Sequence, residues 1–171
     1  MTTFSKYFLL LLSFSLLSCN SQTGYSDLDE LYSDFVVFLK DADENNLKDY
    51  CNKITPDQGT VDYMKNNNFS YRGIPEELEK QNIKPSLIGE EFFKSVDYFK
   101  QKLIRNNQLK DLKYIGRERD GEELYDEKLK IYATETFIIM ESNGKKIKCK
   151  LGEMFRIDGK WKTFTSPKLG W

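Results

Sequence analysis

Two glutamates interrupt stretches that otherwise alternate apolar and polar residues, as β-strands do. Glu135 lies within 128–140 and Glu153 within 146–157, and both are in phase with the apolar residues of their stretch. Two carboxylates held close together can share a proton, so that one acts as a general acid and the other as a general base. Whether these two meet depends on how the strands pair.

The turns between the strands decide that pairing. Asn143-Gly144 and Asp158-Gly159 separate three alternating stretches, 128–140, 146–157 and 160–164, which predicts an antiparallel meander. A two-residue first turn would put the apolar residues of the first two strands on opposite faces of the sheet. A three-residue loop, which includes the preceding serine, puts them on one face. We therefore predict the three-residue loop.

In this register Ile139 lies opposite Ile147, and Glu153 is a diagonal neighbour of Glu135, roughly 7–8 Å away. Two carboxylates on an apolar face are costly unless they are paired or line a polar cavity. The alternative is a β-bulge that shifts the register and turns one or both glutamates to solvent.

Aromatic residues, which make up 14% of the chain, could complete such a cavity. Phe35, Phe99 and Trp161 are the candidates to line it beside Glu135 and Glu153, with an apolar or sugar-like molecule as the ligand. The alternative is that these aromatic side chains fill the core.

The chain contains no histidine. This excludes Ser-His-Asp and Cys-His mechanisms, a histidine general base and the histidine-containing metal sites. With 26 basic and 27 acidic residues, the net charge of −1 gives no reason to expect nucleic acid as a partner. We expect no metal and no cofactor, and no residue is assigned a catalytic role beyond the hypothesis of paired glutamates.

The N-terminus predicts the compartment. Lys6 precedes an apolar run over 7–17 that is much shorter than the ~20 residues needed to span a bilayer, so residues 1–18 are predicted to be a signal peptide. Residues 16–19, Leu-Leu-Ser-Cys, resemble the lipobox of bacterial lipoproteins. This resemblance implies cleavage before Cys19 and lipidation of its thiol and new amine, and hence a cell-envelope protein anchored to a membrane, for which we expect the outer membrane. Ordinary secretion is the alternative.

Residues 19–25 are predicted to be a tether and residues 26–171 a single domain, which is long enough to bury its own core. Apolar spacing and caps predict helices over 26–40 and 47–54, from Thr55 as a cap to the Asn66–Asn68 run, and over 86–107. One or two helical turns are expected over 75–81, and further strands over 69–73 and 109–118.

The order of helices, one long helix and a meander that ends in FRIDGKWKTF (155–164) resembles the nuclear-transport-factor-2-like superfamily from about Asp27 to Phe164. The resemblance implies an α+β fold of the cystatin-like roll type, with N-terminal helices packed on a curved antiparallel sheet. It also implies a conical cavity between helix and sheet, which relatives use for ligand binding, catalysis or dimerisation.

Cys51 and Cys149 are the cysteines that remain once Cys19 is lipidated. Each lies on the apolar side of its predicted element, and an envelope protein folds in an oxidising compartment. The two could form a disulfide or remain two buried free thiols, and both alternatives stay open.

Three functions are compatible with these features. The first, which we favour, is a membrane-anchored module that binds a small ligand or an envelope protein. The second is a cavity enzyme of the polyketide-cyclase or isomerase type that uses Glu135 and Glu153. The third is an envelope immunity protein that blocks a toxin. The missing histidine weighs against the enzyme.

Overall fold

The computed structural model describes residues 24–70, 74, 76–121, 123–127 and 131–169. The predicted signal peptide and Cys19 lie outside these residues, so the lipid anchor stays a prediction. None of the described helices combines the length and the hydrophobicity that a membrane span requires.

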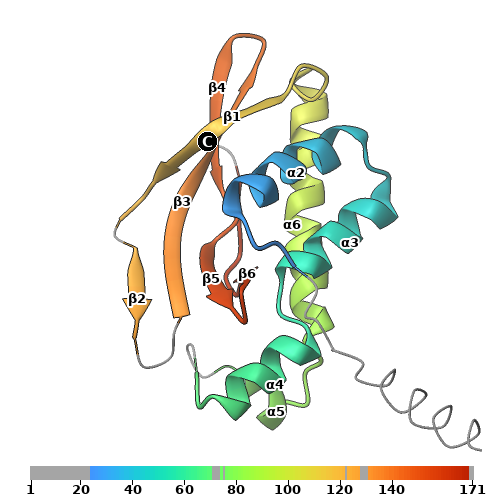
Figure 1. Cartoon of the computed structure of the whole chain (residues 1–171). Coiled ribbons are helices and arrows are strands. Elements are labelled where there is room, and N and C mark those ends of the chain that lie inside the picture. Colours follow the sequence, from blue (N-terminus) through green and yellow to red (C-terminus); the bar gives the residue numbers. More distant parts are fainter. Residues whose placement is uncertain (1–23, 71–73, 75, 122, 128–130, 170–171) are drawn as a thin grey trace, which may run out of the picture.

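Helices precede strands along the chain and pack against an open antiparallel sheet (Figure 1). The fold is therefore α+β, as predicted. The helices are α2 (Leu28–Asp41), α3 (Glu44–Ile54), α4 (Gln58–Asn66), α5 (Glu76–Lys80) and α6 (Ser86–Arg105). The strands are β1 (Lys113–Arg119), β2 (Leu124–Asp126), β3 (Ile131–Ser142), β4 (Lys145–Lys150), β5 (Glu153–Ile157), β6 (Lys160–Thr163) and β7 (Lys168–Leu169).

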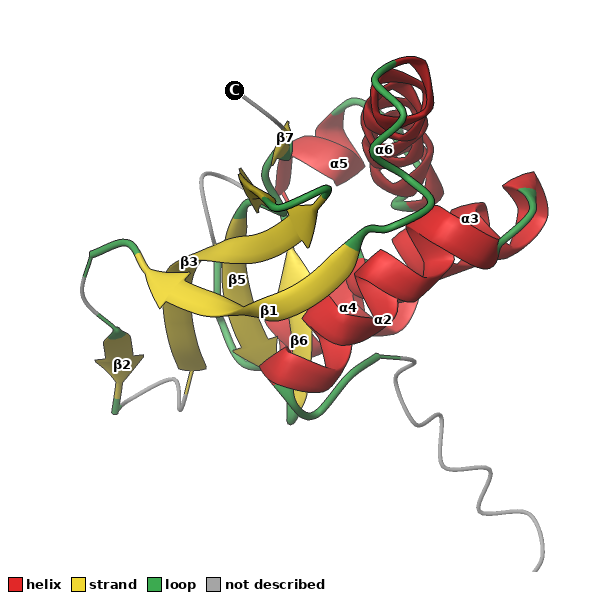
Figure 2. Cartoon of the chain, turned by 90° about the horizontal axis from the view of Figure 1, so that it is seen from above, coloured by secondary structure: helices red, strands yellow, loops and turns green. Residues whose placement is uncertain are grey.

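The long strand β3 organises the sheet. β1 and β2 pair with one of its edges, and β4 and β5 pair with the other. β6 extends the sheet beyond β5, and β7 extends it beyond β4. Figure 2 shows the strands gathered on one side of the molecule and α2, α3 and α6 on the other.

Both hairpin turns of the meander have two residues. The first leaves only Asn143 and Gly144 between its strands, and their φ angles of 50° and 71° fit a type I′ turn, whose twist matches that of paired strands. The predicted three-residue loop is therefore wrong. Ile139 lies opposite Lys148 and not opposite Ile147.

The error arises because the core lies on the unexpected face of β3. The inner face, which packs against the helices, carries Thr134, Thr136, Ile138, Met140 and Ser142. The hydroxyl groups of Thr136 and Ser142 are tolerated there because distant elements supply their partners. The Tyr32 hydroxyl is hydrogen-bonded to Thr136, and Ser142 donates to the Gln108 carbonyl over 2.6 Å. The odd-numbered apolar residues of β3 lie on the opposite, outer face.

The helices lie close to their predicted positions. The helix predicted over 86–107 is α6, and it buries the apolar side chains at helical spacing: Phe92, Val96, Phe99 and Leu103. The predicted cap of α4 is wrong, because Asp57 is the N-cap and accepts the backbone N–H of Thr60 over 2.7 Å. Thr55 is instead the C-cap of α3, where its hydroxyl donates to the Cys51 carbonyl.

A second, smaller core covers one end of the outer face. Its buried members are Met64, Phe69, Ile131, Phe155 and Ile157. Phe69 is therefore a core residue and not part of a strand; positions 71–73 of the strand predicted over 69–73 lie outside the described residues. Because α3 packs on the inner face and α4 on the outer face, their connection passes around the β6 edge of the sheet.

Tyr25, the last residue of the predicted tether, belongs to the domain. Its side chain is buried, and its hydroxyl donates to Asp34 over 2.8 Å. Its carbonyl accepts the backbone N–H of Trp161, also over 2.8 Å. The domain thus begins before Ser26.

Cys51 and Cys149 are free thiols, both buried in the main core. Burial raises the pKa of the Cys51 thiol to about 12 and also raises the pKa of Cys149. Of the two alternatives left open by the sequence, the structure contains the free thiols and not the disulfide.

Candidate functional site

One extra residue in the chain opposite β3 brings Glu135 and Glu153 together. Ile138 lies opposite Cys149 and Glu135 opposite Glu153, so three steps along β3 match four along its partner. The extra residue falls at the break between β4 and β5, next to Gly152. A register shift was the predicted alternative. Here it aligns the two glutamates instead of turning them to solvent.

Gly152 makes this break possible. Its φ of 106° lies in a region that side-chain-bearing residues rarely adopt. A Cβ atom at this position would also collide with the hydroxyl groups of Thr163 and Thr165. Thr165 accepts the backbone N–H of Glu153 over 2.9 Å, which holds the start of β5 against the C-terminal segment.

Lys150 lies beside the glutamates with only 7% of its side chain exposed. Its ammonium group pairs with Glu135 over 2.6 Å and with Asp120, and it lies 4.6 Å from the centre of the Phe137 ring. Burial by itself lowers the pKa of a lysine, but the two carboxylates outweigh burial, and the pKa of Lys150 is raised. Lys150 is therefore a fixed positive charge on the outer face.

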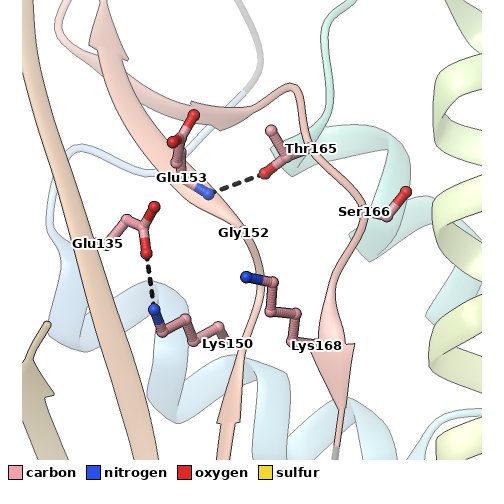
Figure 3. A pocket seen from close by; sticks show the side chains of 7 residues that line it. All are labelled: Glu135, Lys150, Gly152, Glu153, Thr165, Ser166 and Lys168. Atoms are coloured by element: carbon pink, nitrogen blue, oxygen red, sulfur yellow. Dashed lines mark hydrogen bonds and ion pairs between the residues drawn. The ribbon is translucent and has the colours of Figure 1, made fainter.

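The two glutamates border two adjoining cavities on the outer face, which together we call the outer cleft. The smaller cavity, of about 120 Å³, is lined by Glu135, Lys150, Gly152, Glu153, Thr165, Ser166 and Lys168 (Figure 3). The larger cavity, of about 440 Å³, is lined by Asp120, Gly121, Leu124, Ala133, Thr134, Glu135, Glu153 and Phe155.

The outer cleft combines charged and apolar groups. Among the residues that the structure describes, three carboxylates and two ammonium groups line it, so their summed formal charge is negative and favours a cationic ligand. Leu124, Ala133 and Phe155 add an apolar wall to the larger cavity. Such a wall with a few placed polar groups is typical of sites for small molecules.

The structure separates the five residues predicted to line one cavity. Glu135 and Glu153 meet in the outer cleft, but Phe35 and Phe99 are buried in the main core. Phe99 also borders a groove beside β4, and Trp161 lines a further cavity on the inner face. The prediction of one shared cavity is wrong because it placed the glutamates on the core face of the sheet.

Two charged residues of the cleft, Lys150 and Asp120, are not apparent from the sequence pattern. Lys150 alternates with Lys146 and Lys148 along the sequence, but Lys146 and Lys148 are exposed while Lys150 is buried. Gly152 is the signal that could have revealed the difference, because a glycine inside a strand is typical of a bulge. Asp120 comes from a loop, where no periodicity indicates the direction of a side chain.

The geometry indicates what the site can do. The ammonium group of Lys150 forms an ion pair with Glu135, next to Glu153. Glu135 and Glu153 are therefore not an isolated pair of carboxylates that share a proton. Carboxylates so placed accept hydrogen bonds from cationic or neutral donors. Within the described part of the chain, no cluster of acidic residues and cysteines could hold a metal ion.

Comparisons with known proteins return no family model that matches this chain, and no significant match among curated proteins or solved structures.

Proposed function

We propose that this chain is a membrane-anchored lipoprotein of the cell envelope that binds a small ligand in its outer cleft. The ligand carries an ammonium group on a short apolar body. Residues 16–19, which resemble a lipobox, support the anchor, and the outer membrane is the expected location. The outer cleft supports the binding function.

One observation carries the binding proposal, namely that Glu135 and Glu153 lie opposite one another at the wall of a partly apolar cavity. Its volume of about 440 Å³ falls in the range of ~300–1,000 Å³ found for small-molecule sites. An ammonium group between the two carboxylates gains charge-assisted hydrogen bonds, while Phe155 and Leu124 contact the apolar body.

We also propose a distant relationship to the nuclear-transport-factor-2-like superfamily. It is supported by the order of elements, in which α6 precedes an antiparallel sheet that ends in the β5–β6 hairpin. The outer cleft is on the face of the sheet away from α6, so its use would differ from the cavity that this resemblance implies.

Two matched probes test the ligand class. 2-Phenylethylamine and 2-phenylethanol share a ring and a two-carbon chain and differ in the charged group. In an NMR titration of the isotopically labelled full chain in detergent, we expect the amine to shift the amide signals of Glu135 and Glu153. The alcohol should bind at least tenfold more weakly, which corresponds to about 1.4 kcal/mol.

Replacing Glu153 with Gln should weaken binding of the amine about tenfold, since a hydrogen bond to a charged group contributes roughly 1.5–3 kcal/mol. Glu118→Gln, on β1, is the matched control and should leave the affinity unchanged. Equal affinities for amine and alcohol, or no shift with either probe, would contradict the proposal.

Cell fractionation tests the anchor separately. One acyl chain gives marginal membrane binding and two give stable anchoring, so a multiply acylated Cys19 should keep the protein in the membrane fraction. Cys19→Ser should release it or leave the precursor uncleaved. Wild-type protein that is soluble, with an unmodified mature N-terminus, would rule out the anchor.

A further inference from the structure

A row of aromatic and arginine side chains crosses the inner face of the sheet. Tyr125 of β2 lies opposite Tyr132 of β3. Tyr132 in turn lies opposite Arg156 of β5, and Arg156 lies opposite Trp161 of β6. Residues paired in this way point to the same face, with Cβ atoms about 4.5–5.5 Å apart. The four side chains therefore form one continuous row, which we call the aromatic row.

The aromatic row is accessible. Tyr125 and Tyr132 are 47% and 41% exposed, Arg156 is exposed and Trp161 is half-buried. The rings of the two tyrosines lie 4.5 Å apart between centroids, at an angle of 35°. A contiguous exposed patch of this kind marks an interaction site more often than scattered apolar residues do.

Part of this row lines a cavity of about 290 Å³ between the sheet and the beginning of α2. Trp161 is held there by the hydrogen bond from its backbone N–H to the Tyr25 carbonyl. Arg117 lines the same cavity and is held by an ion pair with Asp29 over 3.2 Å. The walls are thus positioned by contacts within the fold, without a ligand.

Arg156 is the arginine of this cavity that has no partner, and Glu123 is a carboxylate of the same cavity that also has none among the described residues. The guanidinium of Arg156 forms no ion pair or hydrogen bond with the residues that the structure describes, whereas Arg117 is paired with Asp29. The carboxylate of Asp27, at the same wall, accepts the backbone N–H of Glu30 over 2.8 Å. A guanidinium binds a carboxylate or a phosphate through two parallel hydrogen bonds, so Arg156 favours an anionic group.

The cavity also offers partners for hydroxyl groups. Thr134 lines it and is only 4% exposed, and among the described residues its hydroxyl oxygen has no hydrogen-bond partner. A buried polar group left in this state is costly, so a ligand that supplies a partner gains free energy. Glu123 lines the cavity as well, and its carboxylate is able to accept hydrogen bonds from the hydroxyl groups of a ligand.

We propose that this cavity binds a single saccharide ring that carries an acidic group, either a carboxylate or a phosphate. The acid pairs with Arg156, and the C–H face of the ring lies on Trp161 and Tyr132, whose ring faces carry negative potential. The hydroxyl groups of the sugar form hydrogen bonds with Thr134 and Glu123. A volume of about 290 Å³ is at the small end of ligand sites and suits one ring. The cavity lies on the other face of β3 from Glu135 and Glu153, although Ala133 and Thr134 border both this cavity and the outer cleft.

Trp161 provides the signal for the test. The chain has two tryptophans, so Trp171→Phe leaves Trp161 as the sole tryptophan, whose fluorescence can be excited selectively over that of the tyrosines. We expect a saturable change in its fluorescence with glucuronic acid, glucose 6-phosphate or both, at concentrations at least tenfold below those needed with glucose. Which acid binds distinguishes a carboxylate ligand from a phosphate ligand.

Variants connect the signal to the site. Arg156→Gln should reduce the affinity for the acidic sugar to that for glucose, while Arg105→Gln, at the end of α6, should change nothing. Glu153→Gln should also change nothing, which separates this proposal from that of the outer cleft. Thermal unfolding of each variant verifies that it is folded.

Three results would overturn the proposal. The first is a folded protein that gives no saturable response to either acidic sugar. The second is a response that Arg156→Gln does not reduce. The third is tighter binding of phenylacetate than of both acidic sugars, which would point to an aromatic acid and not to a saccharide.

Discussion

Two lysines are buried on the outer face of the sheet, and they differ in what surrounds them. Lys150 borders the outer cleft and is held by the carboxylates of Asp120 and Glu135. Lys162 lies opposite Phe155, at the edge where the chain passes from α3 to α4, and its side chain is 0% exposed. Their pKa shifts have opposite directions, raised for Lys150 and lowered for Lys162.

Lys162 connects three elements of the fold. Its ammonium group donates to the carbonyls of Lys53 over 3.0 Å and Thr55 over 3.2 Å, and to the Asp57 carboxylate over 3.2 Å. The carbonyls are at the C-terminal end of α3, where the helix dipole stabilises a cation, and Asp57 caps α4. Burial lowers the pKa of Lys162, and Asp57 offsets only part of that effect.

The comparison shows that burial alone does not identify a functional lysine. Lys162 is satisfied largely by backbone carbonyls, so it serves the fold. Lys150 is satisfied by carboxylates that remain 45% and 35% exposed beside a cavity, so a ligand can reach the same groups. The partners of a buried charge therefore separate the two roles.

The largest effect is expected from Lys162→Met. The change removes the donor to the carbonyls of Lys53 and Thr55, at a place where the lysine side chain is 0% exposed, and one of the partners of Asp57. This should cost roughly 3 kcal/mol. Urea unfolding measures this loss, with the neighbouring Lys160→Met as control. A loss below about 1 kcal/mol would show that Lys162 does not hold the α3–α4 connection.

Gly152→Ala should have the next largest effect. Its positive φ and the collision with Thr163 and Thr165 together should cost roughly 2 kcal/mol, and amine binding in the outer cleft should be lost as the register changes. Gly116→Ala is the matched control, because Gly116 also has a positive φ, of 142°, but nothing lies within 4 Å of a Cβ atom there. Equal losses of stability in Gly152→Ala and Gly116→Ala would mean that the collision with Thr163 and Thr165 plays no part.

Lys150→Met should cost about 1 kcal/mol or less, because water can solvate the partly exposed carboxylates that it leaves. The outer cleft becomes more negative, so the affinity for 2-phenylethylamine should increase several-fold. Unfolding and titration of the same sample measure both quantities. A stability loss as large as that of Lys162→Met would remove the distinction between the two lysines.

The smallest effect concerns alkaline pH. The pKa of Lys162 is lowered in the folded state, so as pH rises the folded protein loses this proton before the unfolded chain does. The contribution of Lys162 to stability therefore rises with pH between that lowered value and the ordinary 10.5. Lys150, whose pKa is raised, contributes fully below 10.5 and loses that contribution as pH rises through its folded pKa.

In urea unfolding above neutral pH, the difference in free energy of unfolding between wild type and Lys162→Met should therefore grow with pH. The difference between wild type and Lys150→Met should shrink at still higher pH. If both differences in free energy of unfolding changed with pH in the same way, the environments of the two lysines would be equivalent.

The sequence by itself determined the α+β class, the position of α6 and the places where the meander turns. The spacing of Phe92, Val96, Phe99 and Leu103 identified one face of α6, and that face is buried. Asn143-Gly144 marked the first hairpin, although the length of its loop was predicted wrongly. These features could be predicted because helical periodicity and turn chemistry depend on residues close together in the chain.

Only the tertiary structure decided which face of β3 lies in the core and which groups meet Glu135 and Glu153. Thr136 lies in the core because Tyr32, from α2, supplies its partner, and the two glutamates are aligned by a break at Gly152 that the alternation of residues does not reveal. Lys162 is likewise buried among groups of α3 and α4. The physical reason is that burying a polar group without a partner is costly, and the partners of Thr136 and Lys162 come from distant parts of the chain.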